Sequence, residues 1–190
     1  NYLKFVKTLA YSDIWLHNHR NKHSRAILSY IWRWRSFPSY IQQLEMESLG
    51  KQPHINSEFK KTGQIIFGGY GPRAQHSFFQ LLHQGTQDVC VDIIVNKEDK
   101  KSLAYVQAIT QAELLSQGAN DLKEHERING KIPTNLFLIN SSDSYDLGYL
   151  IATWEHRIFI TASMLEINPF DQFGVSAGKI YTSKYMSYKD

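Results

Sequence analysis

An apolar run in the middle of the chain restricts the possible fold more than any other feature. Apart from its aspartate, the segment from residue 89 to residue 95 is unbroken and apolar, and reads Val-Cys-Val-Asp-Ile-Ile-Val. A short run of this kind is typical of a β-strand that is covered on both faces, as in the parallel sheets of α/β proteins. We therefore expect a sheet with helices packed on both of its sides.

The rest of the chain alternates between strand and helix patterns. Strands in alternation with helices predict an α/β sandwich with a largely parallel sheet. Further strand candidates are residues 26–30, 64–67 and 136–139, and helical periodicity covers residues 1–16, 37–49, 74–83, 102–117, 144–164 and 175–186. The segments between them predict loops or turns at residues 17–23, 51–63, 68–72 and 96–101.

Composition excludes several classes of protein. The 190 residues are 42% hydrophobic and 21% charged, which suits one domain with an ordinary core. The net charge of +3 is spread along the chain, so we expect no nucleic-acid-binding face, and no apolar run is long enough for a transmembrane helix. The single cysteine, Cys90, excludes an intramolecular disulfide and is more typical of a core residue than of a catalytic thiol. With neither an initiating methionine nor a signal peptide, the chain is expected to begin inside a longer protein.

A first candidate site is the pair Gln43 and Glu47. The two residues are four apart in a helical pattern, so their side chains share one face. A carboxylate beside an amide near a helix end can act as a general base while the amide holds a substrate oxygen. The alternative is an ordinary solvated glutamate, which is the commoner case on an arbitrary helix.

Two more candidates are His76 and Lys179. His76 lies in the first turn of a predicted helix, where free backbone N–H groups favour anions. Lys179 lies seven residues after Gln172, two turns along a helix, and a lysine that faces a pocket can stabilise a developing oxyanion or hold a phosphate. From position alone, a capping histidine and a solvated lysine are the commoner interpretations.

Two motifs argue for no metal and no dinucleotide site. The histidines His17, His19 and His23 are interleaved with Lys and Arg, and Asp13 is the one carboxylate near them, so we expect no metal site. The glycines at 68, 69 and 71 do not fit the G-x-G-x-x-G pattern and predict a turn.

Three longer segments together identify a family. Residues 42–51 read QQLEMESLGK, residues 68–86 read GGYGPRAQHSFFQLLHQGT, and residues 155–179 contain EHRIF, INPFDQFGV and a final GK. In this order and at these separations they resemble the glucose-6-phosphate isomerase family, over nearly the whole chain. The resemblance implies a SIS-type (sugar isomerase) three-layer sandwich with a largely parallel central sheet. It also implies that residues 1–190 are the C-terminal lobe of a longer enzyme.

The resemblance implies a role for each candidate residue. Glu47 is the base that moves a proton between C1 and C2 during aldose–ketose isomerisation through a cis-enediol, His76 opens the sugar ring, and Lys179 assists at the ring oxygen. Gln43 and Gln172 contact the substrate. The implied partners are a sugar phosphate and a second copy of the chain, since in this family His76 reaches the neighbouring subunit's site. The resemblance implies no metal, organic cofactor, nucleic acid or membrane, and a cytoplasmic location.

The chain departs from the family pattern at two places. The triplet 72–74, Pro-Arg-Ala, stands where the family has T-N-G, and residues 29–32, Ser-Tyr-Ile-Trp, stand where it has P-Y-D-Q. The loops that grip the phosphate, and an arginine at the reaction centre, belong to the N-terminal half of the family's enzymes. The alternative function is therefore a non-catalytic module that binds sugar phosphates or a partner protein. The presence of Glu47, His76 and Lys179 together favours the enzyme.

Overall fold

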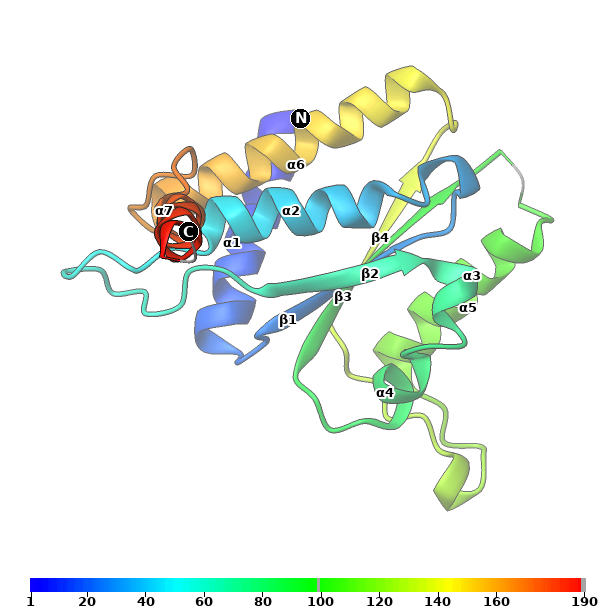
Figure 1. Cartoon of the computed structure of the whole chain (residues 1–190). Coiled ribbons are helices and arrows are strands. Elements are labelled where there is room, and N and C mark those ends of the chain that lie inside the picture. The colour runs from blue at the N-terminus through cyan, green and yellow to red at the C-terminus, as the bar shows by residue number, and fades with distance from the viewer. Residues whose placement is uncertain (99, 189–190) are drawn as a thin grey trace.

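A four-stranded, all-parallel sheet forms the centre of the molecule (Figure 1). The computed structural model describes residues 1–98 and 100–188. The strand order is β2-β1-β3-β4, with bounds β1 Ser24–Ser29, β2 Ile65–Tyr70, β3 Val89–Asn96 and β4 Thr134–Ile139. The apolar run at residues 89–95 is β3, an inner strand whose first seven residues are all buried. The prediction of a strand covered on both faces is confirmed.

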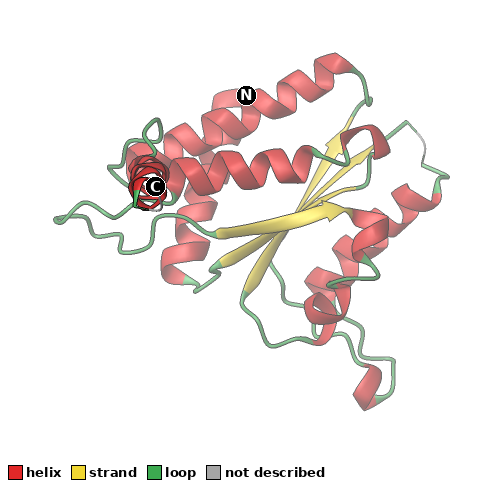
Figure 2. Ribbon diagram, in the orientation of Figure 1, coloured by secondary structure: helices red, strands yellow, loops and turns green. Residues whose placement is uncertain are grey.

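Helices cover both faces of the sheet, which confirms the α/β sandwich (Figure 2). One face carries α1 (Tyr2–Ile14), α2 (Phe37–Leu49) and α6 (Ser144–Met164), and the other carries α3 (Gly71–Ala74), α4 (Phe79–Gln84) and α5 (Leu103–Gln117). A last helix, α7 (Phe173–Ser187), has no buried residue. Short helical turns cover Trp15–His19, Trp32–Trp34 and Glu124–Glu126. No helix of the described residues is long and apolar enough to cross a membrane.

Each face of the sheet has its own apolar core. Side chains alternate between the two faces along a strand, so neighbouring residues of β1 enter different cores. Ile27 packs in the core that contains Ile41 and Trp154, from α2 and α6. Leu28 packs in the core that contains Phe79, from α4. The three layers therefore follow from one strand that is apolar on both sides.

Two helices begin with a side-chain cap. Ser102 accepts a hydrogen bond from the backbone N–H of Tyr105 at the start of α5, and Asp143 accepts one from the N–H of Asp146 at the start of α6. Such caps satisfy backbone donors that have no partner within the helix. Helix α5 ends before Gly118, whose φ of +77° suits glycine.

The predicted turn at residues 68–72 is wrong, because Gly68 and Gly69 lie inside β2. Gly68 pairs with Ile27 of β1 and has a φ of +149°. A Cβ atom at Gly68 would lie 1.9 Å from the carbonyl oxygen of Ile27. The glycine lets two backbones approach within the sheet, and the chain turns only at Gly71.

Two other predicted segments also differ. The helix expected over residues 74–83 is broken, since α3 ends at Ala74, α4 begins at Phe79, and a turn lies between them. The loop expected at residues 17–23 begins inside a π-helical turn, Trp15–His19, that continues α1. Of the charged turn expected at residues 96–101, Asp99 lies outside the described residues.

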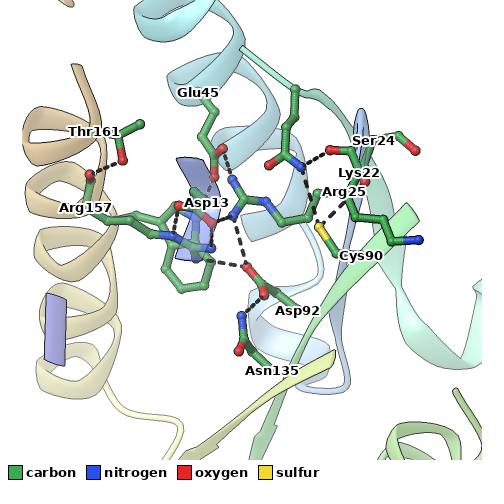
Figure 3. A network of polar contacts seen from close by, with 12 residues as sticks. Asp13, Lys22, Ser24, Arg25, Glu45, Cys90, Asp92, Asn135, Arg157 and Thr161 are labelled. Atoms are coloured by element: carbon green, nitrogen blue, oxygen red, sulfur yellow. Dashed lines mark hydrogen bonds and ion pairs between the residues drawn. The ribbon is translucent and has the colours of Figure 1, made fainter. Parts of the chain in front are cut away.

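A network of five buried charged residues joins three helices to the sheet (Figure 3). Arg157 of α6 donates two hydrogen bonds of 2.6 Å to the carboxylate of Asp13 and one of 2.9 Å to Asp92 of β3. Arg25 of β1 forms ion pairs with Asp13 of α1 and with Glu45 of α2. The network therefore fixes α1, α2 and α6 relative to β1 and β3.

The three carboxylates of this network outnumber its two guanidinium groups. Burial raises the pKa of Asp13, but Arg157 and Arg25 lower it more, so the net shift is downward. Burial raises the pKa of Glu45 above its usual range, and the two arginines do not reverse this shift. Neutral donors also contribute to the network, since Trp154 Nε1 donates to Glu45 at 3.0 Å and Asn135 donates to Asp92 at 2.7 Å.

The buried His17 gives the fold a predictable response to acid. Burial above all, together with the nearby His23, Lys61 and Arg25, lowers the pKa of His17 from 6.5 to about 4. As pH falls, the His17 imidazole is protonated in the unfolded state before it is protonated in the folded state. The stabilisation by neutral His17 is therefore complete above pH 6.5 and is lost as pH falls towards 4. By linkage, His17 lowers the free energy of unfolding by about 2 kcal/mol between pH 7.5 and pH 5.

This loss is measured by urea denaturation of the wild-type chain and of His17→Gln at both pH values. Between pH 7.5 and pH 5, we expect the free energy of unfolding of the wild type to fall by about 2 kcal/mol more than that of His17→Gln. His125→Gln is the matched control, because His125 is exposed, and its loss should equal that of the wild type. Equal losses in the wild type and in His17→Gln would contradict the assignment.

Candidate active site

Glu47 lies in the last turn of α2. The buried residues Ile41, Glu45 and Leu49 are spaced four apart and turn one face of α2 towards the sheet. Glu47 is two residues from Glu45, which directs its side chain away from that buried face, and it is half-buried. The end of α2 therefore presents a carboxylate beside the sheet rather than in the core.

This carboxylate borders an open cleft of about 810 Å³. One wall is the end of α2 and the residues after it, and the other is the segment of residues 166–175, which leads into α7. Gln172 Nε2 donates a hydrogen bond of 2.7 Å to Glu47 Oε2 across the cleft. The lining residues are Met46, Glu47, Gly50, Lys51, Gln52, His54, Glu166, Ile167, Asn168, Asp171, Gln172, Phe173, Gly174 and Val175.

Lys51 also joins the two walls. Its ammonium donates to the backbone carbonyl of Glu47 at 2.7 Å and to the backbone carbonyl of Asp171. It also lies 3.3 Å from the Asp171 carboxylate. Sequence reasoning gave Lys51 and Asp171 no role, although both fall inside the QQLEMESLGK and INPFDQFGV segments that carry the resemblance.

Gln43 lies one turn before Glu47 on α2 and is exposed. The neighbouring Gln42 is the one that contacts the sheet, through a hydrogen bond of 2.6 Å from its amide to the carbonyl of Ile66. Gln43 therefore shares the face of Glu47, as the spacing predicts, but it lies outside the lining of the cleft among the described residues.

His76 lies at the other end of the sheet. It is exposed, in the turn after α3, and its backbone N–H donates to the carbonyl of Arg73 at 3.1 Å. Figure 1 shows that α2 runs back along β2, so Glu47 lies near the start of β2 and His76 follows its end. The six residues of β2 span about 20 Å. The structure therefore does not bring His76 and Glu47 of one chain together.

Lys179 is exposed on α7. It follows Val175, a lining residue of the cleft, by four residues, so the two share one face of the helix. Within the described residues its ammonium has no hydrogen bond or ion pair. The structure thus directs Lys179 to the side of α7 that borders the cleft, one turn beyond it.

Two further features considered from the sequence are the histidine cluster and Cys90. Among the residues that the structure describes, no group of three or more His, Cys, Asp and Glu side chains is arranged to hold a metal ion. Cys90 is free and buried, and burial raises the pKa of its thiol to about 11. A thiol with this pKa stays protonated near neutral pH, which suits a core residue.

A family model described as phosphoglucose isomerase matches residues 5–188. A glucose-6-phosphate isomerase of Hydrogenovibrio crunogenus is 38% identical, with 96% of this chain and 39% of the relative covered. An enzyme of the same name from Acinetobacter baylyi is 37% identical, with 87% of this chain and 35% of the relative covered. The chain therefore spans less than two fifths of the length of these relatives.

Solved structures agree with these sequence matches. A glucose-6-phosphate isomerase of Chlamydia trachomatis superimposes with a TM-score of 0.83 at 29% identity, and the match covers 96% of this chain and 38% of that one. A hypothetical protein of Thermus thermophilus shares the fold, with a TM-score of 0.74 at 22% identity over 92% of this chain and 44% of that one. The match to the family model and the motifs at both walls of the cleft lead to one assignment: the chain belongs to the phosphoglucose isomerase family.

Proposed function

We propose that this chain carries the proton-transfer half of a phosphoglucose isomerase site, and that the complete enzyme interconverts glucose 6-phosphate and fructose 6-phosphate. The observation that carries the proposal is the 2.7 Å hydrogen bond between Gln172 and Glu47. It joins two segments 125 residues apart in sequence, and it lies at the edge of the cleft. Relatives that match 96% and 87% of the chain are named glucose-6-phosphate isomerase.

Glu47 supplies the base. Its carboxylate takes the proton from C2 of the open-chain aldose, and the electrons of that C–H bond form the C1–C2 double bond of a cis-enediol as O1 gains a proton. The hydroxyl on C2 then loses its proton to become the ketone, and C1 receives a proton from Glu47. A single carboxylate on one side of the substrate serves both steps. Gln172 and Gln43 hold substrate oxygens, and the same route requires no metal or organic cofactor.

His76 acts in the second subunit of a homodimer in this proposal. Glu47 and His76 of one chain lie near opposite ends of β2, a strand of six residues that spans about 20 Å. A second copy that places its His76 end against the Glu47 cleft removes this separation. His76 then opens the sugar ring by proton transfer to or from the ring oxygens.

Lys179 completes the set from α7. A cation on the cleft side of this helix stabilises negative charge at the ring oxygen as the ring opens. Because α7 has no buried residue, the rest of the enzyme or the second subunit positions it. The expected compartment is the cytoplasm, as the resemblance to the family implies.

The isolated 190-residue chain is expected to show no turnover of fructose 6-phosphate, because it spans less than two fifths of its relatives. A hybrid enzyme, in which residues 5–188 replace the matching segment of the Hydrogenovibrio crunogenus enzyme, is expected to be active. Both are assayed by coupling formation of glucose 6-phosphate to a dehydrogenase.

Two results would contradict the proposal. Turnover by the isolated chain would show that the cleft needs no other part. A folded hybrid enzyme that binds fructose 6-phosphate without converting it would favour the alternative function, a non-catalytic sugar-phosphate-binding or regulatory module. The comparisons favour the enzyme over this alternative.

A further inference from the structure

We propose that Lys51 is a positioning residue that holds the two walls of the cleft together and so aligns Glu47 with Gln172. The inference rests on the proposed function and adds a residue to it. Lys51 does not lie at the reacting atoms in this account, since its ammonium points at backbone carbonyls and at Asp171.

The Lys51 ammonium makes two hydrogen bonds and one ion pair. A lysine has three N–H donors, and here three oxygens surround it: the Glu47 carbonyl, the Asp171 carbonyl and the Asp171 carboxylate. The Lys51 side chain is 15% exposed, so water competes little for these donors. Hydrogen bonds with one charged partner are about twice as strong as neutral ones.

The first of these oxygens belongs to a helix end. The carbonyl of Glu47 lies in the last turn of α2, where carbonyls have no partner within the helix and carry partial negative charge. Lys51 therefore stabilises the turn that carries the catalytic carboxylate. One ammonium fixes the backbone of Glu47.

The other two oxygens belong to the residue next to Gln172. Because Asp171 is held by both its carbonyl and its carboxylate, the backbone that enters Gln172 is fixed as well. The 2.7 Å hydrogen bond from Gln172 to Glu47 then forms between two side chains whose backbones share one anchor. Without Lys51, the exposed hydrogen bond is the one contact among the described residues that still joins the Gln172 and Glu47 side chains.

Loss of the anchor is expected to reduce catalysis far more than it reduces stability. A displacement of about 1 Å at a reacting group costs about 10²-fold in rate. We therefore expect Lys51→Met to lower kcat/KM of the hybrid enzyme by about 10²-fold. Lys51→Arg keeps a cation at the same place and should recover most of that loss. Lys7→Met, at an exposed lysine of α1, is the matched control and should leave kcat/KM unchanged.

A double-mutant cycle separates positioning from a general structural role. If Lys51 acts through Gln172, the loss caused by Lys51→Met is smaller in a Gln172→Ala background than in the wild type. If the loss of kcat/KM in the double variant equals the product of the two single losses within about twofold, Lys51 and Gln172 act independently. That result would overturn the inference. A kcat/KM of Lys51→Arg that is no higher than that of Lys51→Met would also overturn the inference.

Hydrogen–deuterium exchange on the 190-residue chain tests the same anchor without activity. Lys51→Met should speed exchange in residues 166–174, while exchange in β3 stays unchanged. Unchanged exchange in residues 166–174 would overturn the inference. An inactive wild-type hybrid enzyme together with faster exchange in Lys51→Met would reject the proposed function and leave the anchor supported.

Discussion

Glu47→Gln in the hybrid enzyme is expected to lower kcat for fructose 6-phosphate by about 10²- to 10⁴-fold, the range that a positioned general base contributes. The amide has nearly the shape of the carboxylate but does not accept the C2 proton. KM should change little, because Gln172 and the rest of the cleft remain. Steady-state kinetics with the coupled dehydrogenase assay measure both constants.

The matched control for this variant is Glu166→Gln. Glu166 is a second carboxylate in the lining of the same cleft, and one of its oxygens lies 4.0 Å from Nδ1 of His54. Its replacement changes the charge of the cleft as much as Glu47→Gln does. If the lost negative charge alone caused the fall in kcat, Glu47→Gln and Glu166→Gln would lose activity equally. That result would contradict a specific role for Glu47.

Arg157→Met is expected to destabilise the chain by about 3–5 kcal/mol, the cost of removing one partner from a buried ion pair. Arg157 is 1% exposed and donates three hydrogen bonds to Asp13 and Asp92. Its loss leaves Asp13 with Arg25 alone, and Asp92 with Asn135 and a guanidinium nitrogen of Arg25 at 3.8 Å. Buried carboxylates that lose their cation are strongly destabilising.

Urea denaturation followed by tryptophan fluorescence measures this effect, since Trp154 packs beside the network. Arg127→Met, at an exposed arginine, is the control and should change stability by less than about 0.5 kcal/mol. A loss of less than about 1 kcal/mol in Arg157→Met would show that the network contributes little to the fold.

The layers of the fold could be predicted from the sequence because the periodicity of the apolar residues fixes them. The run at residues 89–95 is an inner strand, and the helix predicted over residues 37–49 has those bounds in the structure. The prediction of a turn at residues 68–72 failed because contacts with a distant strand decide the structure there. Gly68 lies in a strand because β1 approaches it closely, a contact that local sequence does not encode.

The buried network was missed, although part of its signal is visible in the sequence. Glu45 stands midway between Ile41 and Leu49, at the spacing of one helix face, and Arg157 lies beside Ile158 on the buried face of α6. Each position predicts a buried charge that needs a partner. Which residues pair could not be predicted, because the partners come from five different elements.

The candidate site was predicted by resemblance more than by pattern. The spacing of Gln43 and Glu47 indicates a shared face, but only the motif connects Glu47 with Gln172, and the structure then places them 2.7 Å apart. The positioning contacts of Lys51 depend on where a loop returns, which no local pattern predicts. The roles of all five site residues stay predictions, and two of them, His76 and Lys179, lie outside the cleft lining among the described residues.

The proton that moves between C1 and C2 provides the most direct test that Glu47 is the base. The hybrid enzyme is incubated with glucose 6-phosphate in D₂O, and the C2 hydrogen is followed by proton NMR. We predict that the wild-type hybrid enzyme replaces this hydrogen with deuterium, and that Glu47→Gln does not while it still binds the substrate. Exchange at the wild-type rate in Glu47→Gln would contradict the account.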